Sequence, residues 1–146
     1  MLNTDFREFL EFLNENKVRY LVVGGFAVAI HGYPRYTKDI DIWVEMEQEN
    51  ISRLIRALDQ FGFASLGLKS EDFLVEDQII QLGYPPERIY ILVTLPGVEF
   101  ATCYEAKATI DVDGIQVPFI NKEHFIKNKR ASGRHQDLAY IENLGD

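Results

Sequence analysis

The chain has 146 residues, a formal net charge of -8 and 47% hydrophobic residues. This length suits one domain with a substantial core, so we expect residues 1–146 to form a single domain. The acidic balance argues against an extended nucleic-acid-binding surface, and the single cysteine excludes an intramolecular disulfide. Neither a secretory leader nor an apolar run of membrane-spanning length is evident, so we expect a cytoplasmic protein with no membrane partner.

Helix and strand signals alternate along the first half of the chain. Apolar residues recur at helical spacing in three segments, which are 6–13, 26–32 and 49–63. Between the helical segments, runs rich in β-branched and aromatic residues predict strands over 18–23 and 39–45.

The second half continues with more strands. Residues 77–83 and 88–95 are strand candidates separated by a proline pair, and 108–120 has the pattern of a hairpin with an Asp-Gly turn. We expect its second strand at a sheet edge, because Pro118 cannot donate to a ladder. One or two helices follow Asn121. The pattern predicts an α/β (α+β) fold with a small mixed sheet flanked by helices.

Two aspartates interrupt an otherwise apolar strand. Successive side chains of a strand point to opposite faces, so Asp39 and Asp41 share one face while Ile40 and Ile42 share the other. Two bare carboxylates would repel each other, and a hard divalent cation such as Mg²⁺ relieves that repulsion. The alternative is a solvated strand face that carries two acids.

A glycine pair stands between the first predicted strand and the helix after it. Without Cβ atoms, Gly24 and Gly25 leave the backbone N–H groups open to an anion such as a phosphate. The alternative is a plain tight turn. The spacing fits neither the Walker P-loop nor the dinucleotide-binding glycine motif.

Together, "VVGGFAVAIHGYPRYTKDIDIWV" resembles the signature of the polymerase-beta-like nucleotidyltransferase superfamily. That signature has a hydrophobic run, Gly, Gly or Ser, a spacer, and then Asp, hydrophobic, Asp or Glu, hydrophobic. The chain is also similar to the small bacterial branch with minimal nucleotidyltransferases and abortive-infection toxins, whose C-terminal motif resembles "KNKRASGRHQDLAYIENL". The matching residues are Gly24, Gly25, Ala27, Val28, His31, Gly32, Arg35, Thr37, Asp39, Asp41, Lys129, Gly133, Arg134, Asp137 and Leu144.

The resemblance implies a reaction and a set of site residues. An acceptor hydroxyl would attack the α-phosphate of an NTP and release pyrophosphate, with RNA, protein or a small molecule as the acceptor. Asp39 and Asp41 would be catalytic and would hold Mg²⁺, or Mn²⁺ in its place. A partner chain or a homodimer would complete the acceptor site. The implied nucleotide-binding residues are Gly24, Gly25, Arg35, Thr37 and Lys129.

The third acid of the family pattern is missing from this sequence. Relatives of this branch read like R-I-D-I-L where this chain has "RIYIL", so Tyr90 takes the place of the carboxylate. A phenol is a poor Mg²⁺ ligand and a poor base at neutral pH. Asp111 or Asp113 is one alternative source of the third acid, Glu76 or Asp77 is another, and a shifted alignment is a third explanation.

Three functions are compatible with this sequence. The first is an active Mg²⁺-dependent nucleotidyltransferase. The second is a weakened or inactive relative that binds nucleotide or a protein partner, as in a toxin–antitoxin pair, and Tyr90 favours it. The third is an interaction domain in which the glycine and aspartate motifs are coincidental. Turnover separates the first two, and nucleotide binding separates both from the third.

Overall fold

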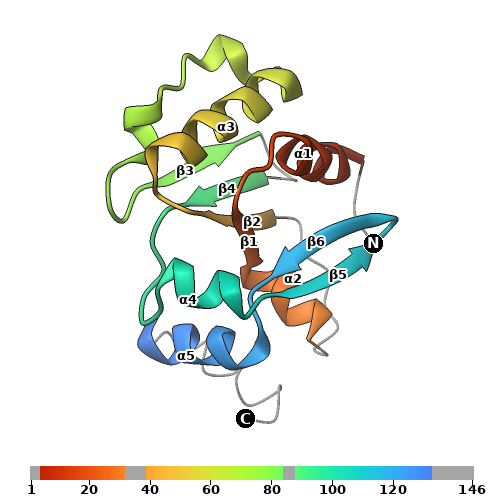
Figure 1. Ribbon diagram of the computed structural model, residues 1–146, viewed down its shortest axis with the longest axis vertical. Coiled ribbons are helices and arrows are strands. Elements are labelled where there is room, and N and C mark those ends of the chain that lie inside the picture. Colours follow the sequence, from red (N-terminus) through yellow and green to blue (C-terminus); the bar gives the residue numbers. More distant parts are fainter. Residues whose placement is uncertain (1–3, 32–38, 84–87, 133–146) are drawn as a thin grey trace.

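The computed structural model describes residues 4–31, 39–83 and 88–132 (Figure 1). These residues form six strands, five α-helices and three short turns of π- or 3₁₀-helix labelled η. In chain order the elements are α1 (Thr4–Glu15), β1 (Tyr20–Val23), α2 (Gly24–Ile30), β2 (Asp39–Val44), α3 (Gln48–Leu58), η1 (Asp59–Phe63), η2 (Ala64–Leu66), η3 (Ser70–Phe73), β3 (Ile79–Leu82), β4 (Arg88–Leu92), α4 (Phe100–Glu105), β5 (Ala108–Val112), β6 (Ile115–Phe119) and α5 (Lys122–Ser132).

The strands form one mixed sheet in the order β3-β4-β2-β1-β6-β5. The β1–β6 and β2–β4 pairs are parallel, and the β1–β2, β3–β4 and β5–β6 pairs are antiparallel. The mixed sheet flanked by helices confirms the predicted fold class. Its centre is the β1–β2 pair, which carries both sequence motifs.

Helices cover both faces of the sheet (Figure 1). On one face, Leu10 of α1 lies with Ile40 of β2 around a small apolar space. On the other face, Trp43 of β2 meets Phe100 of α4 edge-on, with ring centroids 5.2 Å apart. Within the described ranges, no helix combines the length and the apolar character needed to cross a membrane.

The helix predicted over 49–63 ends earlier than its pattern suggests. Its α-helical part, α3, stops at Leu58, and the chain continues as the π-helical turn η1. Gly62 ends this turn with φ of 108°, a value that favours glycine. Helical structure therefore breaks near Gly62, close to the end of the predicted segment, but the turn before this glycine is π-helical and not α-helical.

The edge position predicted for the Pro118 strand is wrong, because β6 lies between β1 and β5. The N–H of Ile120 donates to the Val22 carbonyl at 3.1 Å. Backbone N–H groups alternate sides along a strand, so the N–H that Pro118 lacks would also have faced β1. The β1–β6 ladder consists of a single residue pair, Val22 with Phe119. Pro118 therefore does not interrupt an extended ladder between these two strands.

Helix α4 is absent from the sequence-based prediction. It has only six residues, too few for a clear helical period. Phe100 and Cys103 lie three residues apart on it. Phe100 packs on Trp43, and Cys103 is fully buried. Tertiary packing on β2 therefore stabilises a helix that is too short to be recognised from its sequence.

Burial of Cys103 and Tyr20 makes the fold sensitive to alkaline pH. Burial raises the pKa of the Cys103 thiol from 9.0 to about 11, although the charge of Lys127 opposes the rise. Burial, and then the neighbouring Tyr104, raise the pKa of the Tyr20 phenol well above its ordinary range. The protonated thiol of Cys103 therefore stabilises the fold fully below pH 9.0, and that stability is lost as the pH rises from 9.0 toward 11. The contribution of the protonated Tyr20 phenol is fully present below pH 10.0 and is lost only at higher pH.

We expect the urea midpoint of unfolding to fall as the pH is raised through this window. Cys103→Ala should be less stable than the wild type at neutral pH, since it leaves a small cavity, but its midpoint should fall less steeply between pH 9 and 10. Equal slopes for both proteins would contradict the assignment to the thiol.

Candidate active site

The two aspartates stand on one face of a central strand, as predicted. Asp39 and Asp41 lie on β2 and are half-buried, while the alternating Ile40 and Ile42 are buried on the opposite face. The apolar pair fixes which face the acids occupy, because a one-residue slip would expose both isoleucines and bury both carboxylates. Burial of Ile40 and Ile42 in the core thus directs Asp39 and Asp41 to the opposite face of the sheet.

The glycine motif and the aspartate motif meet in space. The antiparallel β1–β2 register places Val23 opposite Asp41, so Gly24 comes next to that carboxylate. A Cβ built on Gly24 would collide with Oδ2 of Asp41 and would stand 2.9 Å from its Cγ. Gly24 also has φ of 71°, which side chains rarely adopt. The positive φ and the lack of space beside Asp41 both require glycine at position 24.

Arg88 and Tyr90 lie on β4 beside the aspartates. The parallel β2–β4 register aligns Arg88 with Asp39 and Tyr90 with Asp41, and aligned residues of neighbouring strands share a face. Nη1 of Arg88 donates a hydrogen bond of 3.1 Å to the Tyr90 hydroxyl. This bond first, and the charge of Asp39 as a smaller contribution, raise the pKa of the Arg88 guanidinium. The register supports the alignment in which Tyr90 takes the place of the third acid.

The acids of the β5–β6 hairpin do not reach the site. Asp111 lies on β5, three strands from β2, a separation on the order of 14 Å. Its carboxylate accepts hydrogen bonds from the Gly114 N–H at 3.0 Å and the Gln116 amide at 3.3 Å. Asp113 occupies the hairpin turn with φ of 53°. Neither residue supplies the missing carboxylate.

The acids before β3 are also remote from the aspartate pair. The Thr94 hydroxyl donates to the carboxylate of Asp77 at 2.9 Å, and Thr94 follows the end of β4 opposite to Arg88. Thr94 is four residues beyond Tyr90, or about 13 Å along an extended chain. Glu76 is exposed next to Asp77. The geometry therefore excludes both proposed substitutes.

The donor set around Asp39 and Asp41 suits one shared metal ion. Across residues 4–31, 39–83 and 88–132, no group of three or more His, Cys, Asp or Glu side chains is placed to hold a metal. Mg²⁺ commonly takes one or two protein carboxylates and completes its shell with water and substrate phosphates. Two carboxylates therefore fit one Mg²⁺ held jointly with a triphosphate, and Mn²⁺ accepts the same oxygen ligands.

The remaining predicted nucleotide-binding residues fall in different parts of the chain. Gly25 is the second residue of α2. Lys129 lies on α5, where its Nζ stands 5.3 Å from the centre of the Phe125 ring. Arg35 and Thr37 lie outside the described residues. The phosphate-binding roles of all four stay predictions.

His31 has a structural role at the end of α2. Its Nε2 donates to the Ile120 carbonyl at 2.7 Å, and its own backbone closes the helix through the Ala27 carbonyl. The ring thereby joins α2 to the chain between β6 and α5. His31 is thus a partly buried residue at the C-terminal end of α2.

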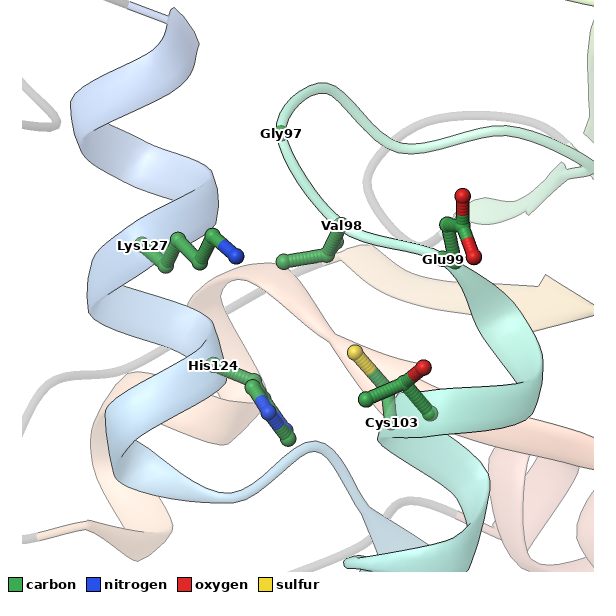
Figure 2. A pocket seen from close by; sticks show the side chains of 7 residues that line it. Gly97, Val98, Glu99, Cys103, His124 and Lys127 are labelled. Carbon is green, nitrogen blue, oxygen red and sulfur yellow. The ribbon is translucent and has the colours of Figure 1, made fainter.

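A polar pocket of about 350 Å³ opens between α4 and α5. Figure 2 shows Lys127 and His124 projecting from α5 toward α4, which carries Cys103. Glu99 and Thr102 also line the pocket, and Nδ1 of His124 is buried without a hydrogen-bond partner in the part of the chain that the structure describes. One wall of the pocket, α5, belongs to the helical region predicted after Asn121, whereas the other wall, α4, is absent from the sequence-based prediction.

Comparisons with known proteins bear on this geometry. No protein-family model matches the chain, and no curated protein matches it either. Among solved structures, TM1012 from Thermotoga maritima, assigned as a nucleotidyltransferase, is 17% identical with a TM-score of 0.65, over 94% of this chain and 88% of that one. The lincosamide antibiotic adenylyltransferase LnuA, with lincomycin bound, is 15% identical with a TM-score of 0.56, over 99% of this chain and 96% of that one.

The chain has a nucleotidyltransferase fold. In this nucleotidyltransferase fold, the β1–β2 pair brings Gly24 against Asp41, and β4 adds Arg88 and Tyr90. Sequence reasoning missed Arg88, although it stands two residues before Tyr90 and so belongs to the same strand face. The two-residue repeat of a strand places positions 88 and 90 on one face, and this repeat could have identified Arg88 from the sequence.

Proposed function

We propose that this protein is a nucleotidyltransferase that moves a nucleoside monophosphate from an NTP to a hydroxyl acceptor with the help of Mg²⁺. The packing of Gly24 directly against the Asp41 carboxylate carries the proposal. It joins the two halves of the motif at one point, with Asp39 two residues away on the same strand face. A plain turn and a solvated acidic strand would not require this contact.

The residues have separable roles in the proposed reaction. Asp39 and Asp41 would hold Mg²⁺ together with phosphate oxygens of the donor, and the ion supplies positive charge at the reacting phosphate. Gly24 keeps the backbone free of a side chain where the Asp41 carboxylate lies, so that this carboxylate can pack directly against the start of α2. The acceptor oxygen forms the new bond to the α-phosphorus, and the bond to the leaving pyrophosphate breaks. RNA, protein and small-molecule acceptors are all compatible with this donor site.

Pyrophosphate release tests the proposed transfer. We expect release in the presence of Mg²⁺, a suitable NTP and an acceptor, with at least about a hundredfold loss in the Asp39→Asn, Asp41→Asn double variant, as for removal of groups that stabilise a transition state. The acceptor screen should include RNA, the protein itself and small hydroxyl compounds. Equal release by the double variant would contradict the assignment.

A second candidate is a nucleotide-binding protein without turnover, acting through a protein partner as in a toxin–antitoxin pair. The alignment of Tyr90 with Asp41 favours this function, because the phenol occupies the neighbouring position where a third carboxylate is expected. The Tyr90→Asp variant separates the two candidates. A gain of transfer activity would identify a degenerated site, whereas a loss of existing activity would show that Tyr90 contributes to the reaction itself.

A further inference from the structure

Beside the acid pair, the site contains a fixed cation. Arg88 is aligned with Asp39 across the β2–β4 ladder, and its Nη1 is held by the Tyr90 hydroxyl at 3.1 Å. A guanidinium held on a strand by a neighbouring side chain loses less freedom on meeting a ligand than a free surface arginine does. The Tyr90 hydroxyl thus positions the cation.

The hydrogen bond to Tyr90 uses only one of the N–H donors of Arg88. Its Nε is buried and has no hydrogen-bond partner among the described residues, and a guanidinium carries five N–H donors in a planar fork. That fork matches the oxygen geometry of a phosphate, and charge-assisted bonds of this kind are about twice as strong as neutral ones. Tyr90 accepts from Arg88 and keeps its own O–H for a second oxygen.

Tyr90 makes the charge of this strand face less negative than a third carboxylate would. Asp39 and Asp41 contribute two negative charges, and Arg88 contributes one positive charge. A third carboxylate at position 90 would add a further negative charge, which a metal ion would have to offset before a triphosphate could approach. With Tyr90 in that position, the face is less repulsive to phosphate when no metal is bound.

We propose that Arg88, held in place by Tyr90, is a phosphate-binding cation that lets the donor site bind an NTP even without a divalent metal ion. The inference rests on the proposed function, because it concerns the same donor site. The aspartate pair would then supply the additional affinity expected with Mg²⁺, and Arg88 would supply the metal-independent part. Arg88 is the binding group, and Tyr90 is a positioning residue.

Calorimetry with each NTP, in EDTA and separately in Mg²⁺, tests the inference, with α,β-methylene analogues in Mg²⁺ to prevent turnover. In EDTA we expect measurable binding by the wild type and a loss of about tenfold or more in Arg88→Gln, as for a lost charge-assisted bond. Arg88→Lys should restore part of this binding. Tyr90→Phe, which removes a single hydrogen bond, should weaken it by about threefold to tenfold.

The exposed Arg56 on α3 provides the matched control, since Arg56→Gln removes the same charge from a different element. A thermal melt of each variant checks that it folds. Wild-type binding in Mg²⁺ with none in EDTA would overturn the inference and leave the proposed donor site intact, as would unchanged affinity in Arg88→Gln. Absence of NTP binding in both conditions would overturn the proposed function as well.

Discussion

Replacement of Gly24 by alanine is expected to abolish NTP binding and to destabilise the fold by a few kcal/mol. The left-handed backbone conformation alone costs an alanine about 1–2 kcal/mol. The new Cβ would also strike the Asp41 carboxylate, which must move or force β1 away from β2. Either movement changes the contact in which the glycine motif packs directly on the Asp41 carboxylate.

Gly67 offers a closely matched control for this change. Its φ of 66° is near the 71° of Gly24, but nothing lies within 4 Å of a Cβ built there. Gly67→Ala should therefore show the conformational penalty without the collision. Urea unfolding and NTP calorimetry on both variants measure the difference, and equal effects on binding would disprove a specific role for the Gly24–Asp41 contact.

Replacement of Asn50 by alanine is expected to destabilise the fold by about 3 kcal/mol or more while NTP affinity is kept, because each buried polar group left unpaired costs about 1–3 kcal/mol. Asn50 is fully buried at the start of α3. Its amide donates to the Arg19 carbonyl at 3.1 Å and the Glu45 carbonyl at 2.9 Å, and its Oδ1 accepts from the Arg19 N–H at 2.7 Å.

These bonds hold the ends of β1 and β2 that lie away from Gly24 and Asp39. The variant should therefore lose stability but retain the geometry of the candidate site at temperatures where it stays folded. Ser52→Ala is the control on the same helix, because it removes only a hydrogen bond to the preceding turn. Urea unfolding should separate the two variants clearly, and similar midpoints would contradict the anchoring role of Asn50.

The sequence predicts well what depends on local period. The shared face of Asp39 and Asp41 follows from the strand repeat, because Ile40 and Ile42 must be buried together. The β5–β6 hairpin follows from its Asp-Gly turn, and both turn residues have the positive φ that such a turn requires; they are Asp113 and Gly114.

What the sequence leaves open depends on contacts between distant segments. The parallel pairing of β2 with β4 brings Arg88 beside Asp39, although nearly fifty residues separate them in the chain. The strand order places β6, which contains Pro118, between two other strands of the sheet. The rule that proline belongs on an edge strand does not predict this position. Helix α4 exists because Phe100 packs on Trp43. Each of these features is decided by tertiary structure.

Calorimetric titration of each NTP, with and without Mg²⁺, tests the central claim most directly. The wild type should bind at least one NTP more tightly in Mg²⁺ than in EDTA. That gain should disappear in the Asp39→Asn, Asp41→Asn double variant if the thermal melt shows it folded. A folded double variant that keeps the full gain, or a wild type that binds no NTP at all, would contradict a nucleotide donor site at Gly24, Asp39 and Asp41.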